Sequence, residues 1–213
     1  LMKLENINHR NYTLDLLKTI SVFLVICIHS PFPGSYGAHV TALSRIAVPI
    51  FFMISGYYFC NGTGSEFKKR QVIKVLKLVV FSNILFFIFK ASISIVKGEF
   101  LLKLTTWFSL KSFLKFILLN ESPFSGHLWY LTAILYVLLI FTIVKKSNNI
   151  KLLLIITPIL LSIDLILGKY SLLIWGREFP YILVRNFLFV GIPYFSIGYI
   201  LNISSKNIKI SNK

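Results

Sequence analysis

The chain has 213 residues, of which 56% are hydrophobic and 14% are charged, and its mean hydropathy is +0.77. This composition excludes an ordinary soluble domain of the same length. A formal charge of +16 would indicate nucleic-acid binding in a soluble protein, but here the cations lie between long apolar runs. That arrangement indicates membrane topology, so no nucleic-acid partner is expected.

Six apolar runs are close to the roughly 20 residues that a helix needs to cross a bilayer. The backbone finds no hydrogen-bond partner in lipid, so these segments are predicted to be helices. They lack the alternation of polar and apolar residues that strands of a membrane barrel show. The runs are residues 14–30, 46–59, 78–96, 128–144, 152–167 and 187–203. We expect an all-α polytopic transmembrane bundle that forms one domain over residues 1–213.

The positive charges predict the orientation of this bundle. With the N-terminus inside, 14 of the 23 Lys and Arg residues fall on the inner side. This excess predicts a multi-pass protein of the cell membrane with a cytoplasmic N-terminus. Lys3 and Arg10 precede the first run, as they would in a signal peptide. That run has 17 residues and no small-x-small cleavage site before Pro31, so we expect an uncleaved span.

The segments between the runs carry turn signals and cations. The cluster Pro31–Gly34 predicts a turn that opens an outside loop to about Ala42, and residues 61–64 end the second span. Residues 66–77 form a basic helical connector. Residues 100–119 are predicted to form an interfacial helix with one polar and aromatic stripe. Its stripe contains Lys103, Trp107, Lys111 and Lys115.

The first run carries the ionisable residues on which the functional prediction depends. Lys18 and His29 are 11 residues apart, which places them within roughly 20° of one another on a helix and about 16 Å apart along it. Asp15 precedes Lys18 by three residues and can pair with it. Such a stripe is costly unless it faces the protein interior or water, so it is predicted to line a path. The alternative is that Lys18 is a membrane anchor and His29 lies at headgroup level.

The spacing divides the predicted roles of these side chains. An imidazole suits a general base that takes a proton from a hydroxyl group. At this separation Lys18 cannot assist proton transfer at His29, but it can hold the anionic end of an elongated donor. Cys27 and Cys60 lie near opposite ends of their spans, so we expect free thiols rather than a disulfide.

Further motifs follow the spacing Asp15-x-x-Lys18-x10-His29 along the chain. They are Val48–Tyr57 with Phe-Phe-Met-Ile-Ser-Gly-Tyr, Phe67–Arg70, His127–Leu131, Arg185–Phe187 and Gly191–Tyr199. In this order, over about residues 10 to 203, they resemble the acyltransferase-3 family of multi-pass membrane O-acyltransferases. The variant Phe-Phe-Met-Ile-Ser-Gly-Tyr-Tyr is similar to the membrane half of the membrane-bound serine racemases of vancomycin resistance, although no racemase domain is present.

The resemblance implies transfer of an acyl group, most plausibly acetyl, from cytoplasmic acetyl-CoA to a hydroxyl of a cell-envelope glycan. The implied catalytic residues are His29 and Asp15, and Lys18 and Arg70 would face the donor; no metal is expected. Most members have arginine where this chain has Lys18, which lacks the bidentate fork of a guanidinium. Many have an acidic residue at Pro49. Members usually have about ten spans, so the resemblance implies that these 213 residues correspond to the N-terminal portion of a member.

Several residues keep two interpretations. Arg70 is either a phosphate-binding residue or a positive-inside anchor. For Ser55-Gly56, close packing of a second helix is favoured over a nucleophile. An interfacial belt is favoured for His127 over contact with an acceptor. Asp164 is either a site residue or a partner that neutralises Lys90.

A small-molecule transporter without covalent chemistry is the competing function, and a purely structural membrane subunit is the third. Lys90 and Asp164 within spans favour a transporter. Transporters often contain pairs of Gly- or Pro-broken helices in matching halves, and we find no such pair in the sequence. Transfer of label from acetyl-CoA would distinguish an enzyme from a transporter.

Overall fold

A computed structural model describes residues 11–211 except 31, 63 and 148, so the predictions at Lys3, Arg10 and Pro31 lie outside the described residues. The described chain is helical, without strands, and six of its helical segments are long and apolar enough to cross a membrane. These segments are Tyr12–His29, Gly34–Asn61, Ser65–Val96, Gly126–Lys146, Ile150–Lys169 and Phe187–Ser205. The predicted all-α polytopic bundle with six spans is confirmed.

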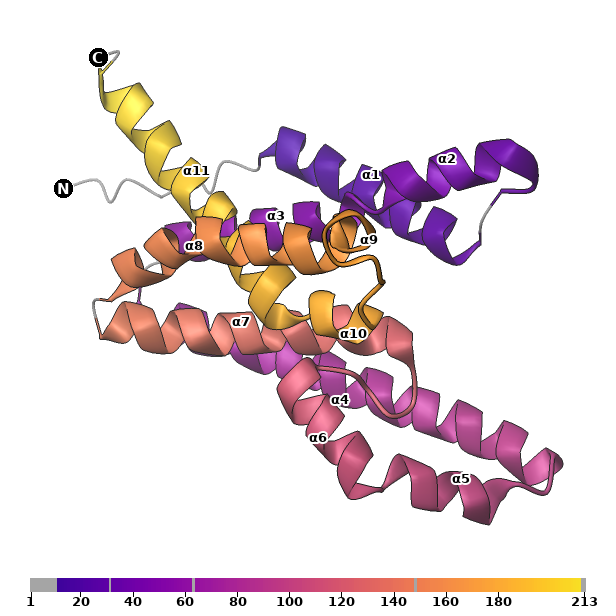
Figure 1. Cartoon of the computed structure of the whole chain (residues 1–213). Coiled ribbons are helices and arrows are strands. Elements are labelled where there is room, and N and C mark those ends of the chain that lie inside the picture. Colours follow the sequence, from indigo (N-terminus) through magenta and orange to yellow (C-terminus); the bar gives the residue numbers. More distant parts are fainter. Residues whose placement is uncertain (1–10, 31, 63, 148, 212–213) are drawn as a thin grey trace.

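The helices run back and forth between two ends of the molecule (Figure 1). Their bounds are α1 Tyr12–His29, α2 Gly34–Ser44, α3 Ala47–Asn61, α4 Ser65–Val96, α5 Phe100–Trp107, α6 Leu110–Leu119, η1 Gly126–Leu128, α7 Trp129–Lys146, α8 Ile150–Asp164, η2 Leu165–Lys169, α9 Ser171–Trp175, α10 Tyr181–Val184, η3 Phe187–Gly191 and α11 Ile192–Ser211. We name the end where α1 stops and α7 starts the histidine end. The end where α1 starts is the basic end.

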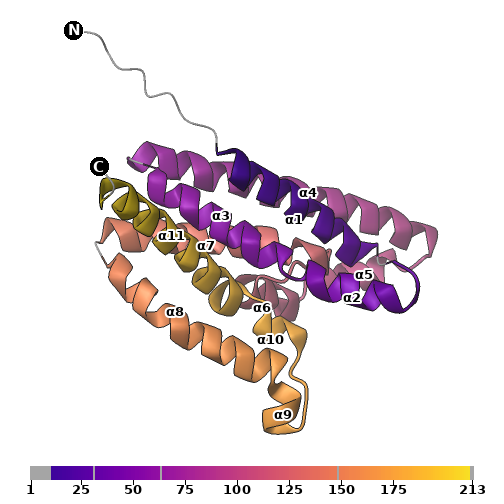
Figure 2. The ribbon, with the colours of Figure 1, turned by 90° about the horizontal axis from the view of Figure 1, so that it is seen from above.

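Three helices form the centre of the bundle. Seen from above, α3, α11 and α7 lie between α8 at one edge and α1 and α4 at the other (Figure 2). Phe52, Phe59, Phe141 and Phe195 from these three helices have no exposed surface. The ring centroids of Phe141 and Phe195 are 4.5 Å apart, a separation typical of packed aromatic pairs. This aromatic core fixes the three helices against which the peripheral helices pack.

The predicted outside loop to Ala42 is wrong, because helix α2 begins at Gly34. Gly34 makes the turn at φ 77°, which costs glycine little. The following residues contain no proline until Pro49, so nothing stops a helix from forming. Pro49, in the first turn of α3, lacks the amide hydrogen that would bond the Arg45 carbonyl, and α2 and α3 are separated at residues 45 and 46.

The basic connector and the third span form one continuous helix rather than two segments. Helix α4 has 32 residues and is therefore about 48 Å long, which exceeds the hydrocarbon thickness of about 30 Å. Gly64 precedes it with φ 91°, as expected from the predicted break at residues 61–64. The helix thus extends beyond the span at one or both of its ends.

The predicted single interfacial helix over residues 100–119 is divided into α5 and α6. Ser109 lies at the break, and its hydroxyl oxygen accepts a hydrogen bond from the Ser112 amide, which caps α6. The break separates the predicted stripe. Trp107 packs against Phe87 of α4 and Phe124, with ring centroids 6.0 and 6.1 Å away, so it belongs to an aromatic cluster.

Candidate active site

Lys18, the predicted donor-binding residue, and His29, the predicted general base, lie on one face of α1 and contact other parts of the protein. The Lys18 Nζ atom lies 3.7 Å from Asp15 Oδ1 and 4.4 Å from the centre of the Tyr58 ring on α3. The predicted pairing of Asp15 with Lys18 is confirmed. Both side chains remain partly exposed, at 41% for Lys18 and 30% for Asp15. An ion pair this exposed to solvent is weak, so the Lys18 ammonium group can also bind an added anion.

At the histidine end, the imidazole of His29 on α1 contacts the imidazole of His127, which lies just before α7. The two imidazole centroids are 4.3 Å apart and the ring planes are inclined by 79°. His29 is the last residue of α1, where Cys27 is buried and the Ser30 amide donates to the Ile26 carbonyl. The sequence favoured an interfacial belt for His127, and that interpretation did not predict a contact with His29.

The segment that carries His127 is held by a chain of hydrogen bonds. The Ser122 hydroxyl donates to Asn83 Oδ1 of α4 at 2.7 Å, which ties the segment to that helix. The His127 amide donates to the Ser125 hydroxyl, and the Leu128 side chain is buried. The backbone of His127 is therefore fixed while its imidazole stays exposed.

The buried side chain of Asn120 joins this segment to two others. Its amide nitrogen donates to the Trp129 carbonyl at 3.1 Å, and its oxygen accepts from the Phe187 amide at 2.9 Å. Asn120 adopts φ 52°, a left-handed conformation that asparagine tolerates better than most residues. The start of α7 and the start of η3 are thereby held together, and the α7 side of this junction, Trp129, is two residues along the chain from His127.

Ser55 and Gly56 have different roles on α3. The Ser55 hydroxyl donates to the Phe51 carbonyl at 2.8 Å, a bond within its own helix. A Cβ atom on Gly56 would lie 2.0 Å from the carbonyl oxygen of Phe195 on α11. A Cβ on Gly198 would come equally close to the backbone of Met53. The predicted close packing of a second helix at Gly56 is confirmed.

Arg70 lies near the start of α4, at the basic end, and is exposed. Two nearby cations converge on the buried Phe59 ring instead. Lys68 Nζ lies 5.7 Å and Lys145 Nζ 5.5 Å from its centroid. Sequence reasoning missed this cluster, because the two lysines come from opposite ends of the chain's fourth and seventh helices.

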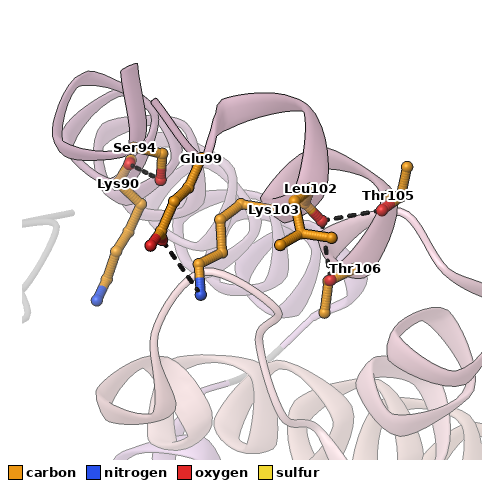
Figure 3. A network of polar contacts seen from close by, with 7 residues as sticks. All are labelled: Lys90, Ser94, Glu99, Leu102, Lys103, Thr105 and Thr106. Carbon is orange, nitrogen blue, oxygen red and sulfur yellow. Dashed lines mark hydrogen bonds and ion pairs between the residues drawn. The ribbon is translucent and has the colours of Figure 1, made fainter. Parts of the chain in front are cut away.

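Asp164 interacts electrostatically with Arg185. Arg185 lies between spans, and the pKa of its guanidinium is lowered to about 10. Burial is the largest cause and the positive charge of Arg45 adds to it, whereas Asp164 acts in the opposite direction. Lys90 is not the partner of Asp164 in these interactions. Its side chain extends to the same side of α4 as Glu99 and Lys103, which form an ion pair at 3.9 Å (Figure 3).

The sequence matches a known family over almost its whole length. Residues 11–213 match the family described as "Acyltransferase domain". The chain belongs to the acyltransferase-3 family. The resemblance inferred from the ordered motifs is therefore confirmed, and this chain is a multi-pass membrane acyltransferase domain.

A curated relative named amino-acid racemase, from Enterococcus faecalis, is 28% identical over 159 residues. The match covers 68% of this chain and 21% of the relative. The chain thus matches about a fifth of the length of that protein, and the relative's name is consistent with the predicted similarity to serine racemases. No solved structure matches the chain.

The structure brings some of the predicted site residues of the acyltransferase domain together and separates others. Asp15 and Lys18 are paired, whereas Asp15 precedes His29 by 14 residues, which is about 21 Å along a helix. Asp15 therefore holds Lys18 and does not contact the imidazole. The contact that sequence reasoning missed is His127 against His29, and its signal was the His-Leu-Trp-Tyr-Leu motif.

Proposed function

We propose that this protein transfers an acyl group, most plausibly acetyl, from acetyl-CoA on the cytoplasmic side to a hydroxyl of a cell-envelope glycan. The observation that carries the proposal is that Lys18 and His29 share one face of α1 and both contact other parts of the protein. Neither side chain is directed only at lipid. Membership of the acyltransferase-3 family supplies the reaction class.

The basic end of α1 suits the phosphate groups of the donor. Lys18 and His29 are about 16 Å apart along the helix, a separation that an extended pantetheine arm can bridge. Lys18 would attract a phosphate as a point charge, while the guanidinium of Arg70 can bind phosphate through two parallel hydrogen bonds. Asp15 would position the Lys18 ammonium group through their ion pair.

His29 would act as the general base at the opposite end of this path. It takes the proton from the acceptor hydroxyl while the hydroxyl oxygen attacks the thioester carbonyl carbon. A carbon–oxygen bond forms and the carbon–sulfur bond breaks. The proton on His29 then passes to the departing thiolate, which leaves as free coenzyme A. The products are the acylated glycan and coenzyme A, and no oxidant, reductant or metal is needed.

No observation among the described residues supports the competing hypothesis of a transporter. Asp164, one of its two motivating residues, interacts electrostatically with Arg185, and Lys90 is exposed on α4 near Glu99 and Lys103. The Enterococcus faecalis relative is named an amino-acid racemase, and this chain matches about a fifth of its length. Its name is therefore not a basis for proposing racemisation by this chain.

Acetyl transfer by the intact protein in native membranes tests the proposal. Membranes are given radiolabelled acetyl-CoA, and label in the glycan fraction is measured. We expect His29→Ala to reduce the transfer by at least about 100-fold, because general-base catalysis contributes 10²–10⁴-fold. His39→Ala is the matched control, since His39 is an exposed histidine on α2. Undiminished transfer by His29→Ala would remove His29 from the mechanism.

A further inference from the structure

The geometry of the histidine end points to a role for His127. We infer that His127 is a positioning residue, which holds the His29 imidazole in the orientation needed for proton transfer through their edge-to-face ring contact. This inference rests on the proposed function, because it assigns a role to His127 only through His29. It adds a residue that neither the family match nor the named relative assigns.

The ring contact restricts the orientation of the His29 imidazole. At 4.3 Å between centroids and 79° between planes, the edge of one imidazole meets the face of the other. Such T-shaped contacts are a preferred arrangement of aromatic rings and restrict rotation of both. Among the residues that the structure describes, no hydrogen bond is found to the His29 ring. The contact with His127 is therefore what orients it.

The segment that carries His127 is itself held in place. A residue can position another only if its own backbone is fixed. The His127 backbone is bonded to Ser125, and the preceding segment is bonded to Asn83 of α4 through Ser122. Asn120 adds a bond to the start of α7. The position of His127, and through it the orientation of the His29 imidazole on α1, therefore depends on α4 and α7.

His29 lies at the end of α1, where its own helix restrains it little. His29 is the final helical residue and is exposed, so its own helix restrains the side chain on one side only. A general base must be aligned with the hydroxyl that it deprotonates, and a displacement of 1 Å can cost about 100-fold in rate. A neighbour that limits the imidazole to one orientation would therefore raise the turnover number more than it changes substrate binding.

Substitutions at His127 in the intact protein separate ring contact from other roles. His127→Ala removes the ring, and His127→Phe keeps an aromatic ring of similar size without the nitrogens. We expect His127→Ala to lower kcat by about 10- to 100-fold with the KM for acetyl-CoA nearly unchanged. We expect His127→Phe to retain kcat within about threefold of the wild type, since the edge-to-face contact is preserved. His39→Ala is again the control.

The double variant distinguishes this inference from the proposed function. If His127 acts through His29, the variant lacking both rings transfers acetyl no more slowly than His29→Ala alone, because residues that act as a unit are not additive. Full kcat in His127→Ala, with His29→Ala inactive, would overturn the positioning role and leave the proposed function standing. Loss of kcat in His127→Phe equal to that in His127→Ala would also overturn it. Undiminished transfer by His29→Ala would instead refute the proposed function itself.

Discussion

Asn120 shows at the residue scale how one buried polar side chain can fix the surroundings of the histidine pair. It has no exposed surface and bonds two backbone groups that are distant in sequence, at Trp129 and Phe187. Burial of an unpaired backbone group costs about 1–3 kcal/mol. The Asn120 side chain therefore stabilises the junction from which His127 extends.

We predict that Asn120→Ala lowers the midpoint of thermal unfolding in detergent by several degrees. The substitution leaves the Phe187 amide and the Trp129 carbonyl without their partner, at a cost of about 1–3 kcal/mol each. Alanine is also strained at φ 52°. Asn149→Ala is the control, because Asn149 is exposed and its side chain makes no capping bond. Equal midpoints for the two variants would contradict this account of Asn120.

The ion pair of Asp15 with Lys18 could be predicted from the sequence, because a spacing of three residues on a helix places the side chains together. The contact of His29 with His127 could not. It depends on how α1 and the segment before α7 approach one another, and no periodicity reports that approach. The converging lysines at Phe59 were missed for the same reason.

Among the helices, α3 and α11 pack so closely that there is no room for a side chain at Gly56 or Gly198. A Cβ on Gly56 would lie 2.0 Å from the Phe195 carbonyl oxygen, and a Cβ on Gly198 would lie 1.8 Å from that of Met53. Small residues allow helix backbones to approach in this way within lipid, where packing drives association. The pair forms the centre against which α1 and α8 pack.

We predict that Gly56→Ala destabilises the protein by about 1–3 kcal/mol or more, because the two backbones must separate to admit the methyl group. The yield of folded protein and the midpoint of thermal unfolding in detergent measure the effect. Gly126→Ala is the control, since no atom lies within 4 Å of a Cβ at that position. A Gly56→Ala variant as stable as Gly126→Ala would show that α3 and α11 are not packed as described.

Element boundaries were less predictable than the existence of the helices. Turn residues correctly indicated the break before α4, where Gly64 has φ 91°. They did not indicate where α2 begins, because a proline–glycine cluster marks a turn but not the length of the loop after it. The regular spacing of Lys103, Trp107 and Lys111 predicted one stripe, but the cap at Ser109 starts a new helix.

At the scale of the whole molecule, hydropathy alone predicted six spans, because lipid requires long apolar helices and tolerates little else. This constraint acts on each segment separately, so it can be recognised in a single sequence. How the spans pack is set by side-chain shape across helices, as at Gly56 and Phe59. That information is distributed over the chain and becomes apparent only in three dimensions.

The proposed reaction joins a donor at the basic end to an acceptor at the histidine end across the membrane. Sealed vesicles of known orientation, containing the intact protein, test it with radiolabelled acetyl-CoA supplied on one side and the glycan acceptor on the other. The account predicts labelled acceptor when acetyl-CoA has access to the side of Arg70 and the acceptor to the side of His29. It would be contradicted if the acceptor is labelled as well when both substrates are confined to the side of His29, or if glycan accumulates across the membrane without label.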